Sequence, residues 1–157
     1  MKERFKTFTV LIAKISRNIK KIKNREMAEY GLRSVHVTCL YYLYSSETHT
    51  ATELCELCEE DKATISRALD LLEENGYVTR TAHFGKRNTS DLSLTEKGAE
   101  MGKKIADKIN CVLDEICTDL TEKEREDFYR SLEIISDSLE LCTKGIQKAK
   151  KIKTNKS

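Results

Sequence analysis

Residues 50–98 read TATELCELCEEDKATISRALDLLEENGYVTRTAHFGKRNTSDLSLTEKG, and the rest of the chain is organised around them. They predict a short helix, a turn, a second helix over residues 61–75 and a two-stranded ribbon with a basic tip. In the second helix Ile65, Leu69 and Leu72 recur at i, i+4 and i+7, and Ala68 lies on the same face. This spacing predicts one buried stripe and one stripe that faces solvent.

Helix 61–75 carries a signal at each end. The Asp61 carboxylate can accept hydrogen bonds from the free amides of the first turn, and Asn75-Gly76 supplies a left-handed stop. The solvent side of the first two turns is polar and basic. It holds Lys62, Thr64, Ser66 and Arg67. Hydroxyls can form hydrogen bonds with base edges or phosphates, and an Arg can donate two hydrogen bonds to guanine. Both are suited to a helix that lies in the DNA major groove.

The predicted ribbon pairs residues 77–81 with residues 91–94, because both runs alternate apolar and polar side chains. Residues 82–90 form a turn-rich loop between them, with cations at its tip. A helix-turn-helix followed by such a hairpin is a winged helix, whose wing reaches phosphates or the minor groove. The predicted wing contacts are Arg80, Lys86 and Arg87, and the preceding helix adds Thr50 and Thr52 as phosphate contacts.

Three motifs carry a resemblance to a known family. DKATISR at 61–67, ENGYV at 74–78 and LSLTEKG at 92–98 resemble the MarR family of bacterial transcriptional regulators. The resemblance implies a homodimer that binds double-stranded DNA, acts as a repressor, and is released by an unknown small ligand or oxidant. One position departs from the pattern: Lys86 occupies the slot where the family carries an Asp, and Arg87 alone matches. The tip is therefore expected to lack the family's salt bridge and to be more basic.

Composition is typical of one soluble, helix-rich domain. The 157 residues include no proline and six glycines, and 34% are charged while 39% are hydrophobic. No stretch approaches the roughly 20 apolar residues that span a bilayer. The basic amino terminus lacks a compact apolar region with a cleavage site. We therefore expect a cytoplasmic protein without a membrane partner.

Long helices are predicted on both sides of the winged helix. Thr95 can cap a helix that runs to about residue 118, and Thr121 to Glu124 form a capping box for the next one. Both terminal helices carry heptad-like apolar seams. The seams are Phe5, Phe8, Ile12, Ile15, Ile19 and Ile22 in the first, and Phe128, Leu132, Ile135, Leu139 and Cys142 in the last. The simplest way to bury both is to interlace two subunits, so that a dimer presents two reading helices to a pseudo-palindrome.

The predicted fold class is mainly α with a small β-wing, in a single MarR-like domain over residues 1–157. Residues 30–98 are assigned to the DNA-binding lobe. Residues 1–29 and 99–148 are assigned to the helical dimerisation lobe, and residues 149–157 form a basic tail. The basic ends are either solvated helix faces or additional phosphate contacts.

A ligand pocket is the less specific of the predicted sites. Tyr41, Tyr42 and Tyr44 cluster in a chain with few aromatics, and they either pack against a neighbouring helix or line a pocket. In the second case Arg33 or His36 would be the polar anchor for a small-molecule effector. No cofactor is predicted.

Six cysteines are many for a cytosolic chain, and Cys55 and Cys58 form a C-x-x-C motif. Their place on a short helix favours packing as small apolar residues. Thiol redox sensing and metal binding stay open as alternatives, since ELCELC also resembles part of the metal-sensing ArsR-type winged helices. No second C-x-x-C or pair of histidines completes a tetrahedral metal site, so no metal is predicted.

Other function classes find less support in the sequence. The chain lacks a Gly-rich phosphate loop, a G-x-S-x-G elbow and an H-E-x-x-H motif, so no enzyme is predicted. A winged-helix adaptor that binds protein rather than DNA remains the alternative, because acidic residues gather at positions 53–60. Steep salt dependence of DNA binding would separate the two.

Overall fold

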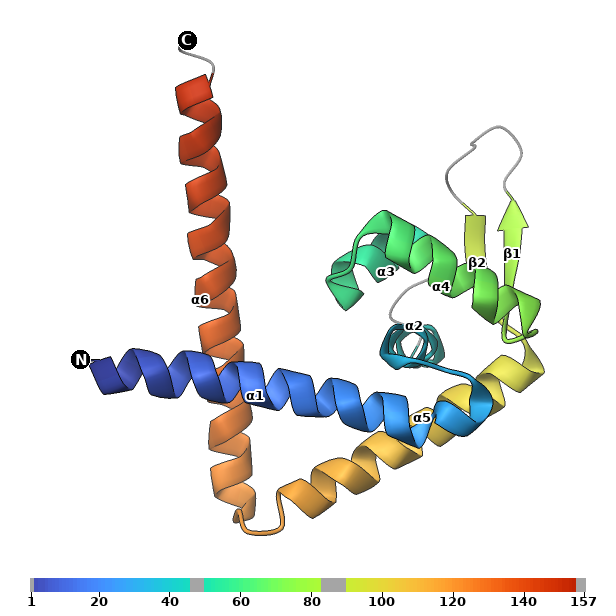
Figure 1. Cartoon of the computed structure of the whole chain (residues 1–157), viewed down its shortest axis with the longest axis horizontal. Helices are drawn as coiled ribbons and strands as arrows, with labels where there is room; N and C mark the ends of the chain where they lie inside the picture. Colours follow the sequence, from blue (N-terminus) through green and yellow to red (C-terminus); the bar gives the residue numbers. More distant parts are fainter. Residues whose placement is uncertain (1, 46–49, 83–89, 155–157) are drawn as a thin grey trace. The chain divides into compact units, whose positions relative to one another are not determined.

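The computed structural model describes residues 2–45, 50–82 and 90–154 and is mainly helical, with one two-stranded sheet (Figure 1). It confirms the predicted mainly α fold with a small β-wing. The elements in chain order are α1 (Lys2–Glu26), the 3-10 helix η1 (Ala28–Tyr30), α2 (Ser34–Tyr44), α3 (Ala51–Cys58), α4 (Lys62–Glu74), β1 (Val78–Ala82), β2 (Ser90–Leu94), α5 (Glu96–Ile116) and α6 (Glu122–Thr154). The chain divides into two compact units, Met1–Asn110 and Cys111–Ser157, which are described separately.

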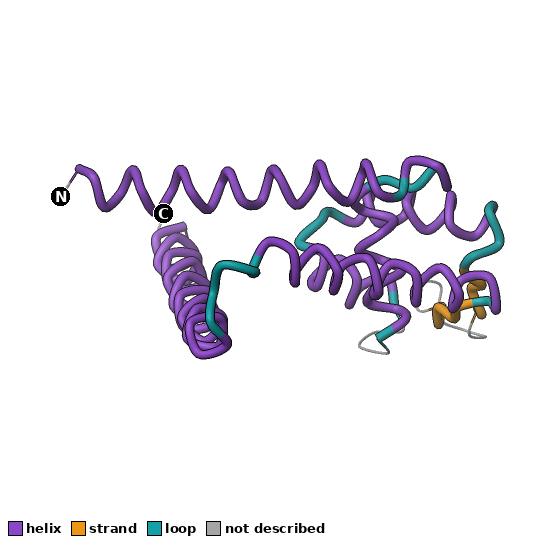
Figure 2. Tube along the Cα trace, turned by 90° about the horizontal axis from the view of Figure 1, so that it is seen from below, coloured by secondary structure: helices purple, strands orange, loops and turns teal. Residues whose placement is uncertain are grey.

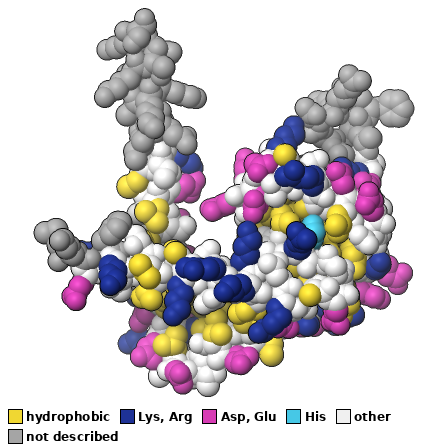
Figure 3. Space-filling view, in the orientation of Figure 1, with side chains coloured by type: hydrophobic (Ala, Val, Ile, Leu, Met, Phe, Trp, Pro, Cys, Tyr) yellow, Lys and Arg dark blue, Asp and Glu magenta, His cyan; other side chains and the backbone are white. Residues whose placement is uncertain are grey.

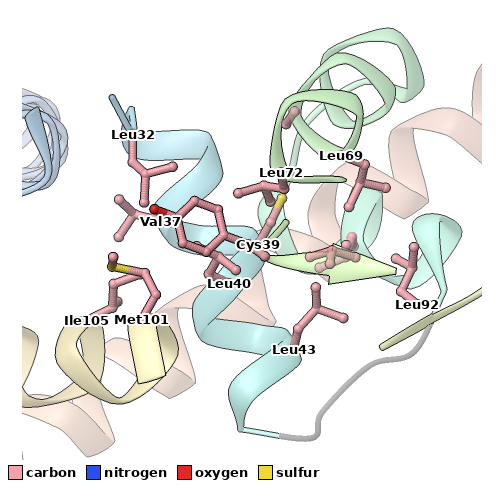
Figure 4. Close-up of a cluster of buried hydrophobic side chains, with 14 of the residues drawn as sticks. Leu32, Val37, Cys39, Leu40, Leu43, Leu69, Leu72, Leu92, Met101 and Ile105 are labelled. Carbon is pink, nitrogen blue, oxygen red and sulfur yellow. The ribbon is translucent and has the colours of Figure 1, made fainter. Parts of the chain in front are cut away.

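Helix α2 lies at the centre of the first unit, where it contacts α1, α3, α4 and β2. A helix that is buried on several sides must be apolar around most of its circumference. Val37, Cys39, Leu40 and Leu43 are accordingly all buried. Figure 4 shows side chains of α2, α4, β2 and α5 converging on this core. Each large aliphatic side chain buried there contributes about 1.5–3 kcal/mol.

Local signals in the sequence fix the ends of the helices in this unit. The Asp61 carboxylate accepts the amide of Thr64 and caps α4, as predicted. Gly76, at a φ of 71°, turns the chain after α4 through the left-handed region. Thr95 accepts the amide of Gly98 at 3.0 Å, which confirms the predicted cap of α5. Gly31, at a φ of 68°, separates η1 from α2.

The wing is an antiparallel pair with Val78 opposite Leu94 and Ala82 opposite Ser90. An isolated bridge between Thr50 and Asp91 joins the start of α3 to β2. Figure 2 shows that the strands are confined to this hairpin and that α1 is one continuous helix. The hairpin thus follows directly after α4, and β1 contacts that helix.

Helix α1 joins the unit near its carboxyl end. Lys108 of α5 approaches the Glu26 carboxylate at 3.3 Å, and the Ser34 amide donates to Asn24 at 2.7 Å. The apolar seam of α1 is left open: Phe8 and Ile15 are 40% and 47% exposed. Figure 3 shows Lys and Arg side chains gathered along α1, with hydrophobic side chains between them.

The second unit contains the end of α5 and α6. Thr121 and Glu124 form the predicted capping box, because the Glu124 amide donates to the Thr121 hydroxyl and the Thr121 amide donates to the Glu124 carboxylate. The apolar seam of α6 is also open, with Phe128 43% and Leu139 52% exposed. Within the described ranges, no helix has the length and apolarity needed to cross a membrane.

Candidate nucleic-acid interface

The first two turns of α4 present a basic and hydroxyl-bearing surface to solvent. Lys62, Ser66 and Arg67 are exposed, whereas Ile65 and Leu69 on the opposite face are at most 1% exposed. Because the buried stripe anchors the helix on the core, the exposed face is held rigidly. A helix fixed from behind, with cations and a hydroxyl in front, has the shape that enters a major groove.

Thr64, the fourth residue predicted on this face, is half-buried and takes part in the helix cap. Its amide donates to one carboxylate oxygen of Asp61 and its hydroxyl donates to the other, both at 2.9 Å. These two hydrogen bonds hold the pKa of Asp61 below its usual range. Since the hydroxyl proton is used locally, Thr64 fixes the start of the reading helix and offers a ligand only its remaining acceptor capacity.

The structure places Arg80 against α4 instead of leaving it free at the wing. Its guanidinium donates to Asp70 at 2.6 Å and approaches Glu73 at 3.1 Å, and its side chain is 27% exposed. Two carboxylates therefore offset the charge that the sequence suggested for phosphate. This pairing holds β1 against the helix and gives Arg80 a positioning role. Lys86 and Arg87, the other predicted wing contacts, lie outside the described residues.

The two threonines predicted at the start of α3 occupy different positions. Thr50 is the amino-terminal cap: its hydroxyl accepts the Glu53 amide at 3.2 Å, and its own amide donates to the Glu53 carboxylate at 2.9 Å. Thr52 is exposed one residue inside the helix. The start of α3 thus offers a hydroxyl at the amino end of a helix, which is a favourable place for a phosphate.

Two pairs of the predicted ligand residues are neighbours: the ring centroids of Tyr41 and Tyr42 are 5.8 Å apart, and the Arg33 amide donates to His36. A groove of about 470 Å³ lies between α1, α2 and the end of α3, and Ile15, Ile19, Lys23, Tyr42 and Cys58 are among its lining residues. Tyr42 alone of the predicted pocket residues belongs to this groove. The sequence did not indicate that α1 lines this groove, because the apolar seam of α1 was assigned to a dimer interface.

The His36 side chain is buried and takes part in the amino-terminal cap of α2. It is 7% exposed, and its Nδ1 atom accepts the Arg33 amide at 3.0 Å, which caps α2. Burial lowers the pKa of His36, and the neighbouring Arg33 charge lowers it further. The neutral imidazole is therefore an acceptor in the helix cap, and its role as a ligand anchor stays a prediction.

The two cysteines of the C-x-x-C motif lie on one helix. Cys55 and Cys58 are half-buried on α3, and the nearby thiol of Cys39 on α2 lowers the pKa of Cys58. Among the described residues, no group of three or more His, Cys, Asp or Glu side chains is arranged to hold a metal ion. Cys39 was not distinguished in the sequence from other apolar residues of its helix.

Comparison with known proteins agrees with this geometry. Residues 30–85 match the model of the MarR family. The chain is 28% identical over 131 residues to the HTH-type transcriptional regulator PapX of Escherichia coli, and the match covers 82% of this chain and 77% of PapX.

Solved structures show the same fold. A MarR protein from Peptoclostridium difficile is 25% identical, with a TM-score of 0.77 over 85% of this chain and 87% of that one. A MarR-family regulator from Listeria monocytogenes, solved with a 26mer DNA, is 23% identical, with a TM-score of 0.75 over 82% of this chain and 85% of that one. Family model, relative and fold coincide on the winged helix built around α4: residues 30–85 match the MarR family, and the chain is similar in sequence and fold to regulators of that family.

Proposed function

We propose that this protein is a homodimeric repressor that reads a pseudo-palindromic operator through α4 and the wing. The observation that supports the proposal most directly is that α4 has one buried apolar face and one exposed polar, basic face. Ile65 and Leu69 anchor the helix on the core, and Lys62, Ser66 and Arg67 project from the other side. Lys62 is suited to phosphate, and Arg67 is suited to a guanine edge.

The open seams of α1 and α6 support the homodimer. Ile12, Ile15 and Ile19 on α1, and Ile135 and Leu139 on α6, are between 37% and 52% exposed. Repeating apolar seams of this kind are stable in water only when a partner helix covers them. A second copy supplies that partner, and two-fold symmetry presents two reading helices about 34 Å apart, one turn of duplex.

DNA binding in the family supports the choice of nucleic acid over a protein partner. The Listeria monocytogenes structure contains a 26mer DNA, and a Staphylococcus aureus MepR structure of the same fold, with a TM-score of 0.75, is a DNA complex. On this chain, the exposed residues of α4 have the polarity that such a contact requires.

A random pool of DNA duplexes, incubated with the full chain at two salt concentrations, tests the proposal. We expect enrichment of a pseudo-palindrome whose affinity falls steeply as salt rises, because each neutralised phosphate releases counterions. Equal recovery of all sequences, from a protein shown to be dimeric, would contradict operator reading. That result would favour the protein adaptor instead.

Two arginines give a matched test of how the operator is read. Arg67→Ala is expected to weaken binding by about 1–3 kcal/mol and to relax the preference at one base pair in each half-site. Arg80→Ala removes the ties to Asp70 and Glu73 and is expected to weaken binding to all sequences alike. Equal losses on every sequence for Arg67→Ala would show that this side chain contacts phosphate and not a base.

We further propose that a small effector releases the repressor by occupying the groove beside Tyr42. The groove touches α1, which carries the dimer seam, and the end of α3, which precedes α4. A coupling free energy of about 1–3 kcal/mol changes operator affinity 5- to 150-fold. Tyr42→Ala should keep operator binding and reduce the response to an effector found by screening. An undiminished response would place the effector site elsewhere.

A further inference from the structure

Two lysines of α1 line the groove between α1, α2 and the end of α3, and their environments differ. Lys20 is exposed, whereas Lys23 is half-buried. The Lys23 Nζ atom donates to the Thr38 hydroxyl of α2 at 3.0 Å. That hydroxyl donates in turn to the Ser34 carbonyl at 2.9 Å, so its oxygen faces Lys23 as an acceptor. The amine of Lys23 is therefore held at one point of the groove wall.

Lys23 forms no ion pair with a carboxylate in the part of the chain that the structure describes. Glu59 and Glu60 line the same groove without pairing with it, whereas Lys108 of α5 approaches Glu26 at 3.3 Å. Burial lowers the pKa of Lys23, and the nearby Cys58 thiol offsets only part of this effect. A larger fraction of the amine is therefore neutral, which is the form that attacks a carbonyl carbon.

The groove also has an apolar lining. Ile15 and Ile19 of α1, Val35 of α2 and Leu57 of α3 are among the residues that line it. Its volume of about 470 Å³ lies in the range of small-molecule sites. A ligand that uses both features carries an electrophilic carbon for the amine and an apolar tail for the aliphatic side chains. An apolar aldehyde has this chemistry.

We propose that Lys23 is a carbonyl-binding lysine, which forms an imine with an apolar aldehyde that enters the groove. The amine nitrogen attacks the carbonyl carbon, the C=O electron pair moves to oxygen, and a proton passes from nitrogen to that oxygen. The resulting hydroxyl leaves as water with the second amine proton, and the C=N bond forms. No oxidant or reductant is needed, and water reverses the reaction. The inference names the chemical class of the effector proposed for this groove.

Imine formation changes the link between α1 and α2. A neutral imine nitrogen carries no hydrogen, so it cannot donate to the Thr38 hydroxyl. That hydrogen bond ties the carboxyl end of α1 to α2, together with the bond from the Ser34 amide to Asn24 at 2.7 Å. Because α1 also carries a seam of the proposed dimer, the adduct is expected to lower operator affinity. This consequence rests on the proposed function.

A site for anions is the competing role of the same amine. A protonated Lys23 would attract a carboxylate without using a nucleophilic nitrogen. Lys23→Arg separates the two roles, because a guanidinium keeps the charge and the donors but stays protonated. The variant therefore retains an anion site and loses the imine.

The test incubates the full chain with hexanal and cyanoborohydride, which reduces an imine to a stable secondary amine. Mass spectrometry of the peptides locates the modified lysines. We expect the adduct at Lys23 to form at least about tenfold faster than at Lys20, because the groove holds the aldehyde beside one amine. Lys20 is the matched internal control, since it lines the same groove but is exposed. Equal or faster modification of Lys20 would overturn the proposal.

The variant Lys23→Arg completes this test. It should unfold at the same temperature as the unchanged protein and should lose the fast adduct, while the slow modification of Lys20 remains. Hexanoate carries the same tail without an electrophilic carbon. Binding of hexanoate to both proteins, with no fast hexanal adduct at Lys23, would assign the amine to anions and refute the imine. None of these readouts involves DNA.

The link to the reading helix has its own measurement. For protein that binds its operator, we expect hexanal to lower affinity at least about fivefold, within the range of ordinary allosteric coupling. Removal of the aldehyde should restore binding, and Lys23→Arg should not respond. An adduct at Lys23 without a change in affinity would refute the coupling. Absence of operator binding by the aldehyde-free protein would instead count against the proposed function.

Discussion

The first unit buries its apolar stripes within one chain, whereas α1 and α6 carry stripes of similar spacing that stay exposed. Leu72 of α4 is completely buried, but Leu139 of α6 is 52% exposed. Both are leucines on amphipathic helices, and the local sequence does not separate them. The difference lies in the partner: α4 packs against α2, which is apolar on most of its surface, whereas the seam residues Ile15 of α1 and Leu139 of α6 remain 47% and 52% exposed.

This comparison teaches that an apolar stripe indicates burial without saying against which chain. In the first unit, the free energy of burial stabilises a single polypeptide. In the proposed dimer, a second subunit would cover the seams and provide the same kind of stabilisation. The predictions below test this division, beginning with the largest expected effect.

The seam of α6 can be broken by one charge. Leu139→Glu should dissociate the proposed dimer, because each of two subunits loses the burial of a leucine at about 1.5–3 kcal/mol. Sedimentation at several protein concentrations measures the change, and we expect a dissociation constant raised at least about 100-fold. Ile134→Glu is the matched control, since Ile134 is 62% exposed on the same helix but lies off the seam. A variant that stays dimeric at low concentration would remove this seam from the interface.

A substitution in the core of the first unit should lower the free energy of unfolding by the same amount at every protein concentration. Leu40→Ala, at a fully buried position on α2, is expected to lower the free energy of unfolding by about 2–5 kcal/mol. Denaturant titration at low and high protein concentration measures it. Leu139→Ala makes the same chemical change in the seam, and its effect should depend on concentration. If both variants behaved alike, the division between the regions would fail.

Removing a helix cap in each region should have a smaller effect on stability, and the two losses can be compared. Thr95 accepts the Gly98 amide at 3.0 Å and donates to the Gly76 carbonyl at 2.7 Å, so Thr95→Ala should cost about 1 kcal/mol of stability. Thr121→Ala removes a cap on α6 that is exposed, and water replaces part of it, so the loss should be smaller. Thermal unfolding of both variants beside Thr95→Ser provides the test. A larger loss at Thr121 would reverse the expected order.

The weakest expected effect is a pH dependence confined to the first unit. Burial lowers the pKa of His36, so the folded state favours the neutral imidazole. This stability is fully present above the unfolded pKa of about 6.5 and is lost as pH falls through the lower folded pKa. Unfolding free energies at pH 8 and pH 5 should differ less in His36→Asn than in the unchanged protein. Identical pH dependence in both would show that His36 does not titrate with folding.

Much of the reading head could be predicted because its signals are local. Asp61 and Thr95 cap helices whose amides lie within three residues, and Gly76 supplies a turn that needs no distant contact. Strand alternation likewise predicted the hairpin, and the register Val78 to Leu94 follows from it. The secondary-structure elements of the reading head and their order could therefore be predicted from the sequence.

Side-chain partners could not be predicted, because they depend on how helices cross. The ion pairs of Arg80 with Asp70 and Glu73 on α4 could not be foreseen when Arg80 was predicted to contact DNA. The hydrogen bond from the Arg33 amide to His36, a predicted pocket residue, was likewise not foreseen. Nor did sequence spacing indicate that Cys39 of α2 lowers the pKa of Cys58.

The sequence by itself determined the winged helix, the caps that bound its helices and the polar face of α4, because these follow from periodicity and from contacts within a few residues. Only the tertiary structure decided which charges are paired and which apolar stripes remain exposed. Those outcomes depend on distances between helices far apart in the chain, and such distances are set by packing of the whole core and not by any local motif.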